Sequence, residues 1–204
     1  MRFFLLLTSL PFSFLALLLP AQPTPPQARP TPTLAPTPTQ TAPAPTKVAT
    51  PPLVWAATRP LTAADFKARA PFAPGAALTV ADLKASAGCK DYVFAGGVQA
   101  TFDPNNSWIK DTRKFTPALL RHEQLHFDIA ELHARRLRQK ISLFKFDCLK
   151  LQPAFDNLTK PAYRLWNAEE NRYDAETNHG LNAAKQALWE QQVAAKLAEL
   201  KAFE

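Results

Sequence analysis

The chain has few of the residues around which many metal and redox sites are built. Among its 204 residues are two cysteines, one methionine and four histidines. The cysteines, Cys89 and Cys148, form no CxxC pair, which argues against a zinc site made of thiolates. Because neither lies near the N-terminus, a lipid-modified N-terminus is not expected. The only methionine is Met1, which excludes metal sites that rest on a methionine turn within the domain.

A continuous basic stripe, such as nucleic-acid-binding proteins carry, is also missing. Lysine and arginine together number 24 against 17 acidic residues, which gives a formal net charge of +7. The densest basic cluster consists of Arg135, Arg136, Arg138 and Lys140, and Leu137 interrupts it. This spacing is typical of a solvated helix face. The sequence therefore predicts no nucleic-acid partner.

The N-terminal segment has the pattern of a secretory signal peptide. Met1-Arg2 is a short positive start, Phe3–Leu19 is apolar, and Ala21 is a small residue near the cleavage point. The apolar run is short for a membrane span, and Pro11 weakens it further. We therefore expect residues 1–21 to be removed and no stable membrane span to remain. The mature protein is expected to be periplasmic or secreted.

The remaining chain divides by composition into a linker and one domain. Residues 22–52 are rich in proline and threonine and have almost no large apolar side chains, which predicts a disordered linker. Residues 53–204 have the length and apolar content of a single domain with its own core. In an exported chain an isolated cysteine pair is more often bonded than free, so we expect a disulfide between Cys89 and Cys148.

The first half of the domain has strand patterns. Leu53–Trp55 is a short apolar run. Tyr92–Phe94 and Val98–Phe102 flank Gly96-Gly97, which predicts a hairpin with its turn at the two glycines.

The second half has helical patterns. Thr116-Pro117 provides an N-cap followed by proline at the first helical position, and an apolar stripe continues to about Gln139. A second long stretch is expected over Pro161–Thr177, with a break at His179-Gly180 and a continuation over Leu181–Lys201. Strands followed by helices predict an α+β fold, in which a small antiparallel sheet precedes two long helical segments.

The most specific pattern is the HExxH segment His122–His126 on the first of these helices. Residues four apart lie on the same helix face, so His122 and His126 can bind one zinc ion together. Glu123 is then placed to act as a general base on a water molecule that zinc activates. With only four histidines in the chain, this arrangement is improbable by chance. We therefore predict Zn²⁺ as the cofactor, carried by the helical segments of the domain.

A catalytic zinc usually has three protein ligands, and the sequence leaves the third open. HExxHxxGxxH sites are excluded, because Ile129 and Leu132 stand where that pattern has its glycine and third histidine. His179 is the first candidate, since Gly180 would let the backbone bend so that the ring turns toward the metal. Asp174 is the alternative, because a carboxylate on a second helix is an ordinary third ligand.

Two further assignments of candidate ligands stay open. Glu170 is also a possible third ligand, because Glu170 and Asp174 have the spacing of a ligand and the residue that orients it. His179 has a competing structural role, as a histidine that caps the carbonyl groups at a helix end.

The residues around this pattern resemble those of a known family. They are the segment HEQLHFDIAE (His122–Glu131), Tyr173-Asp174, Thr177–Gly180, Gln186 and Trp189. The chain is similar here to a bacterial family of unknown function whose members are predicted to be secreted zinc-dependent proteases. The resemblance extends over most of Leu53–Glu190 and implies zinc, secretion and a zincin-like fold. The proline-rich segment is not part of it.

Other polar residues near the pattern have two interpretations. Asp128 and Glu131 are candidates to orient the zinc-binding imidazoles through their free N–H groups, although Glu131 can equally pair with Arg135 on the surface. Tyr173 or Tyr163 is a candidate hydrogen-bond donor to an oxyanion.

Together these patterns predict an exported zinc-dependent metallohydrolase, a peptidase, that acts on a peptide or protein. We expect Val98–Phe102 to be an edge strand beside the cleft, where an extended peptide can pair with it. The alternative is a non-catalytic envelope protein whose zinc stabilises a binding module. Glu123 favours the enzyme, because a purely structural zinc site needs no base and usually has four protein ligands.

Overall fold

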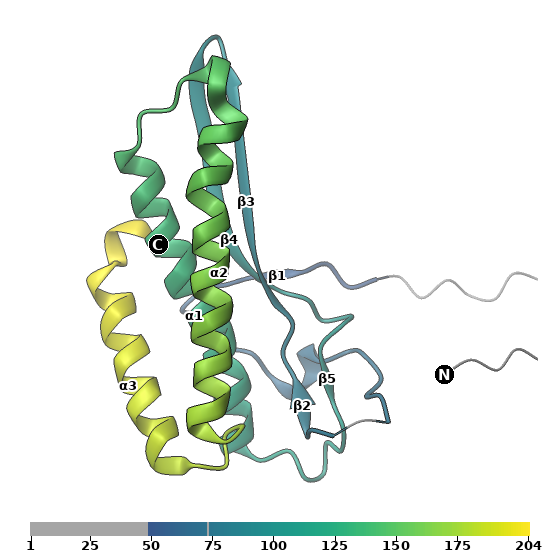
Figure 1. Ribbon diagram of the computed structural model, residues 1–204. Coiled ribbons are helices and arrows are strands. Elements are labelled where there is room, and N and C mark those ends of the chain that lie inside the picture. Colours follow the sequence, from purple (N-terminus) through teal and green to yellow (C-terminus); the bar gives the residue numbers. More distant parts are fainter. Residues whose placement is uncertain (1–48, 73) are drawn as a thin grey trace, which may run out of the picture. The chain divides into compact units, whose positions relative to one another are not determined.

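The computed structural model describes residues 49–72 and 74–204 (Figure 1). The predicted signal peptide, residues 1–21, and most of the predicted linker, residues 22–52, lie outside the described residues. The end of that linker is described, and Thr50 exchanges two hydrogen bonds with the side chain of Asn105, at 3.1 and 2.6 Å. None of the helices in the described residues is long and apolar enough to cross a membrane.

In the described residues the main sheet has three antiparallel strands in the order β1, β4, β3. β1 is Leu53–Val54, β3 is Ala81–Lys90 and β4 is Val93–Phe102. A second antiparallel sheet joins β2, Ala77–Leu78, to β5, Trp108–Ile109. The small antiparallel sheet of the predicted α+β fold is therefore confirmed.

The hairpin is longer than predicted, and its turn lies elsewhere. β3 and β4 pair along their full lengths, with Lys90 opposite Val93. The turn is Asp91-Tyr92, whose φ angles of 50° and 63° suit a tight turn between twisted strands. The predicted turn at Gly96-Gly97 is wrong, because both glycines lie inside β4. β3 consists largely of residues with low strand propensity, and tertiary packing, such as that of the buried Leu83, stabilises it instead.

Val98–Phe102 is also not an edge strand. One side of this segment pairs with β3, and on the other side β1 pairs with Thr101 and Phe102. Beyond β1, the Trp55 N–H donates to the carbonyl of Ala100 at 3.0 Å. The prediction that this segment is an edge strand is therefore wrong.

The described residues contain three α-helices, of which the first two pack on the hairpin and the third packs on those two helices (Figure 1). They are α1, Pro117–Leu143, α2, Leu151–Thr177, and α3, Ala183–Glu199. Single 3₁₀ turns occur at η1, Ala63–Asp65, η2, Cys148–Lys150, and η3, Lys201–Phe203. α1 contacts β3 and β4 as well as α2 and α3, so it lies between the hairpin and α3.

α1, which carries His122 and His126, is capped at its start and packs against neighbours on several sides. Thr116 caps the helix as predicted, accepting a hydrogen bond from the Leu119 N–H at 3.2 Å. One face, including Phe127 and Leu137, joins the core beneath the hairpin. Another face, including Ile129, joins a second core with α3. Each such burial contributes about 1.5–3 kcal/mol, so packing on several sides fixes α1.

α2 begins ten residues earlier than the proline pattern predicts. Pro161 lies inside the helix rather than at its start. Proline removes one backbone hydrogen bond, but Phe155, Thr159 and Ala162 are buried on both sides of it and hold the helix together. The predicted break after Thr177 is confirmed, and α3 resumes at Ala183.

The predicted disulfide is confirmed. Cys89 and Cys148 are bonded, with 5.9 Å between their Cα atoms. The bond ties the end of β3, near the hairpin turn, to η2 at the start of α2. In the loop-entropy account, closing a loop of this length stabilises the fold by about 4 kcal/mol.

Glu169 connects the three helices and also accounts for His133. Its carboxylate lies 2.8 Å from Nε2 of His133 and 2.9 Å from Arg136 on α1, and 3.5 Å from Lys196 on α3. The hydrogen bond with His133, together with the Arg136 guanidinium, lowers the pKa of Glu169 to about 2 despite its burial. His133 therefore has a structural role, in which it joins α1 to Glu169 on α2.

Candidate metal centre

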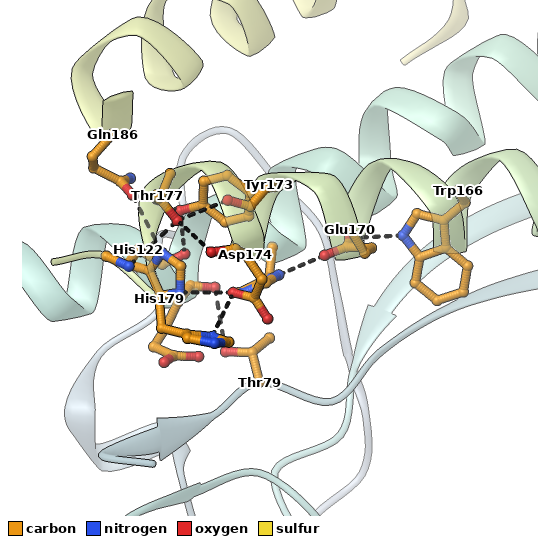
Figure 2. A network of polar contacts seen from close by, with 12 residues as sticks. Thr79, His122, Trp166, Glu170, Tyr173, Asp174, Thr177, His179 and Gln186 are labelled. Atoms are coloured by element: carbon orange, nitrogen blue, oxygen red, sulfur yellow. Dashed lines mark hydrogen bonds and ion pairs between the residues drawn. The ribbon is translucent and has the colours of Figure 1, made fainter. Parts of the chain in front are cut away.

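Three electron-pair donors converge where the histidine face of α1 meets the C-terminal end of α2 (Figure 2). Nε2 of His122 and Nε2 of His126 each lie 3.2 Å from Oδ1 of Asp174. These three atoms all lie within 4.8 Å of one another. His122 is buried, whereas the Asp174 side chain is 34% exposed.

The second nitrogen of each imidazole faces an oxygen acceptor. Nδ1 of His122 lies 3.2 Å from Oε1 of Gln186, and Nδ1 of His126 lies 2.5 Å from Oε2 of Glu170. In a neutral imidazole, an acceptor beside Nδ1 favours the tautomer that carries its proton on Nδ1. In that tautomer both Nε2 atoms present a lone pair to Asp174 and can bind a metal ion.

This arrangement fits a metal ion. Oδ1 of Asp174 is buried and has no hydrogen-bond partner among the described residues, although imidazole nitrogens lie 3.2–3.4 Å from it. Three lone pairs facing one another repel unless a cation lies between them. Two imidazole nitrogens and one carboxylate oxygen are a common ligand set for zinc.

The electrostatics of the cluster also favour a positive charge. Burial alone would lower the pKa of His126, but close contacts with Asp174 and Glu170, and their charges, raise it to about 10. Burial alone would raise the pKa of Asp174, but the approach of His122 and His126 holds it well below its ordinary value.

Glu123 lies beside this cluster with its carboxylate uncommitted. The residue is only 4% exposed, and its backbone carbonyl accepts a hydrogen bond from Oγ1 of Thr79 at 3.3 Å. Among the described residues its carboxylate makes no hydrogen bond or ion pair. Thr79 follows β2, so this short strand runs past the HExxH segment (Figure 2).

His179 lies at the rim of the cluster rather than within it. Its side chain is 74% exposed, and its Nδ1 is 3.4 Å from Oδ1 of Asp174. In the described residues the group of converging ligand atoms contains His122, His126 and Asp174, but not His179. Glu170, the other candidate ligand, hydrogen-bonds to the far nitrogen of His126 instead.

The backbone that carries His179 is unusual. Asn178, His179 and Gly180 all have positive φ, at 48°, 53° and 79°. Side chains rarely adopt this conformation, and runs of it cluster at functional sites. Gly180 is required for a second reason: a Cβ atom there would lie 2.9 Å from Cγ of His122. The loop between α2 and α3 thus packs directly on a proposed metal ligand.

Replacing this glycine should therefore destabilise both fold and site. We expect Gly180→Ala to lower the free energy of unfolding by about 1–3 kcal/mol, through positive φ and overpacking on His122, and to weaken metal binding. Gly97→Ala is the matched control, because a Cβ at Gly97 would meet nothing within 4 Å. Urea titration of both variants measures the difference. Equal stability of the two variants would show that the Gly180 contact is not tight.

Asp128 and Glu131, the residues expected to orient the imidazoles, have other partners. Asp128 accepts hydrogen bonds from Trp55 and Gln124, at 2.7 and 2.8 Å. Glu131 pairs with Arg135 at 2.8 Å, in line with the alternative prediction of an ion pair, although both side chains are buried. Neither acid is hydrogen-bonded to the imidazole of His122 or of His126 in the described residues. The partners of those imidazoles, named above, come from α3 and α2 instead.

Both tyrosine hydroxyls have backbone partners. Tyr173 is fully buried and stacks on His122 with 4.8 Å between ring centroids, and its single O–H can donate either to the His122 carbonyl or to Oε1 of Gln186. Burial raises the pKa of Tyr173 far above its ordinary value. Tyr163 donates to the carbonyl of Leu83. These contacts do not support either tyrosine as an oxyanion donor.

Residues 97–180 match the model of a family described as a bacterial protein of unknown function (DUF922). The matched segment includes His122, Glu123, His126 and Asp174, and it ends before Gln186. No curated protein matches the chain, and no solved structure matches it. The family match agrees with the resemblance seen in the sequence and assigns no activity.

Proposed function

We propose that the chain is an exported zinc-dependent metallohydrolase with a zincin-like fold, which hydrolyses peptide bonds. The observation that carries the proposal is the cluster of His122 Nε2, His126 Nε2 and Asp174 Oδ1, in which the buried carboxylate oxygen has no hydrogen-bond partner among the described residues. His122, His126 and Asp174 would hold the metal.

The roles of the remaining residues follow from their positions. Zinc, when bound, supplies Lewis acidity that makes a water molecule nucleophilic near neutral pH. The free carboxylate of Glu123 would accept the proton of the attacking water and pass it to the leaving nitrogen. Gln186 and Glu170 would hold the imidazoles so that Nε2 points inward.

A catalytic role is better supported than a structural one. Structural zinc sites usually have four protein ligands, whereas the described residues bring together three. The partial exposure of Asp174 and the carboxylate of Glu123, which has no partner among the described residues, suit a fourth position for water. The family resemblance supports a peptide substrate, and the disulfide supports an oxidising compartment outside the cytoplasm.

Metal removal tests the proposal. The purified protein is expected to contain about one zinc ion per chain, the stoichiometry of a three-ligand catalytic site. Its hydrolysis of a mixed peptide library, followed by mass spectrometry, should stop after chelation and return when zinc is added. A protein that binds zinc but cleaves no peptide would support the non-catalytic alternative. One that binds no metal would reject the site.

A further inference from the structure

We propose that Glu190 selects which nitrogen of His122 faces the metal, by fixing the orientation of the Gln186 side chain. This inference rests on the proposed zinc site. It assigns a positioning role to two residues on α3, beyond the matched family segment, which ends at residue 180.

Gln186 lies between a proposed metal ligand and a carboxylate. Its Oε1 is 3.2 Å from Nδ1 of His122 and accepts a hydrogen bond from the Tyr173 hydroxyl at 2.8 Å. Its Nε2 donates to Oε1 of Glu190 at 3.0 Å, and Arg121 lies 3.6 Å from the same oxygen. Gln186 is only 6% exposed, so solvent has little influence on which end of its amide faces His122.

An amide side chain can take two orientations, and most of its neighbours here accept both. If Gln186 turned over, its N–H would face Nδ1 of His122, which would then accept. The Tyr173 hydroxyl would tolerate this as well, because it can accept from an amide and still donate to the His122 carbonyl, 3.1 Å away. A carboxylate can only accept, so Glu190 requires the N–H end of Gln186 on its side.

The orientation of Gln186 decides whether His122 can bind metal. With Oε1 toward Nδ1, the imidazole proton lies on Nδ1 and Nε2 has its lone pair free. With the amide reversed, the neutral imidazole carries its proton on Nε2, which faces Asp174, and that proton blocks coordination. Glu190 therefore acts on the metal through Gln186.

His126 does not need a further residue to orient its hydrogen-bond partner. Its Nδ1 faces Glu170, a carboxylate, which accepts with either oxygen. The other Glu170 oxygen accepts from Nε1 of Trp166 at 2.8 Å. Of the two imidazoles, only that of His122 faces an amide. Only there does a further residue have to fix which end of the partner side chain faces the ring.

The experiment reverses the polarity at position 190 in the full chain and measures zinc affinity by competition with a chelator. Glu190→Lys presents donors instead of acceptors, draws Oε1 of Gln186 away from His122, and should weaken zinc binding by about 10–100-fold. Adding Gln186→Glu to Glu190→Lys should restore affinity close to that of the parent, because the introduced carboxylate accepts from both neighbours. Glu199→Lys, an exposed position on the same helix, is the control for added charge.

Two further measurements separate polarity from charge and packing. Gln186→Ala changes no charge, yet should weaken zinc binding by about 10-fold, because Nδ1 loses its acceptor. In the zinc-loaded protein, the Nδ1–H proton of His122 should give a downfield, exchange-protected NMR resonance. This resonance should be lost in Glu190→Lys and Gln186→Ala and should return in the double variant.

The outcomes distinguish this inference from the proposed function. If the parent binds zinc and Glu190→Lys matches Glu199→Lys in affinity and in the His122 resonance, the role of Glu190 is rejected and the zinc site stands. Failure of the double variant to regain affinity and resonance also rejects it. A parent chain that binds no zinc overturns both.

Discussion

Glu123→Gln is expected to bind zinc as the parent does and to lose about 10²–10⁴-fold of its peptide hydrolysis, the usual contribution of a positioned general base. Glutamine has nearly the same shape, so the buried site and α1 should keep their packing. The Glu123 carboxylate makes no hydrogen bond or ion pair with other described residues, so its replacement breaks no structural contact. What the variant loses is the ability to accept a proton.

The Glu123→Gln result has to be compared with a control variant, and the fold of both variants has to be checked. Glu199→Gln removes a carboxylate from an exposed position on α3 and should leave hydrolysis unchanged. Zinc stoichiometry and thermal unfolding of both variants show whether site and fold persist. If Glu123→Gln cleaves the library at the parent rate while retaining zinc, the base is another residue, and the HExxH interpretation of the mechanism fails here.

The sequence predicts the local features of this molecule well. The pair His122 and His126 needs only helical spacing to share a face, and the Thr116 cap defines the start of the helix that carries them. The break after Thr177 is equally local. Asn178 takes the left-handed conformation that ends a helix, the next two residues also have positive φ, and the glycine at 180 marks the place in the sequence.

Features that depend on tertiary contacts were harder to predict. The β3 segment has little strand propensity, and it is held by pairing with β4, by the buried Leu83 and by the disulfide at Cys89. Likewise, Pro161 is typical of a helix start, yet buried neighbours on both sides carry α2 through it.

The identity of the third metal ligand also depends on tertiary contacts. Glu170, Asp174 and His179 all lie on one stretch of chain, and spacing alone does not say which of them faces α1. That depends on how α2 is rotated against α1, and the stacking of Tyr173 on His122 is one of the contacts that hold this rotation. The amide that faces His122 comes from α3, and no local pattern links it to that histidine.

Asp174→Ala is expected to abolish zinc binding at concentrations that saturate the parent, whereas His179→Ala is expected to retain stoichiometric zinc. Asp174 provides the carboxylate oxygen that lies 3.2 Å from both Nε2 atoms. Removing it leaves two protein ligands, fewer than catalytic zinc sites usually have. His179 is exposed and outside the cluster, so its loss removes no converging atom.

The rate of peptide hydrolysis should also distinguish the roles of Asp174 and His179. His179 projects at the rim near Asp174, where its ring can donate a hydrogen bond to an oxyanion, and loss of such a donor costs about 10²–10³-fold in kcat. His179→Ala should therefore combine full zinc content with slow turnover. Asp156→Ala, which removes a carboxylate from α2 in an ion pair with Lys160, should change neither property.

Zinc content measured on these variants and on Glu170→Ala decides between the ligand assignments. Glu170→Ala, which removes the acceptor for His126 Nδ1, should weaken affinity by about 10–100-fold without abolishing binding. If His179→Ala loses zinc and Asp174→Ala keeps it, His179 is the third ligand, and the loop that carries it must close over the site when metal binds. If both variants keep stoichiometric zinc, neither residue is a ligand, and Glu170 becomes the remaining candidate on α2.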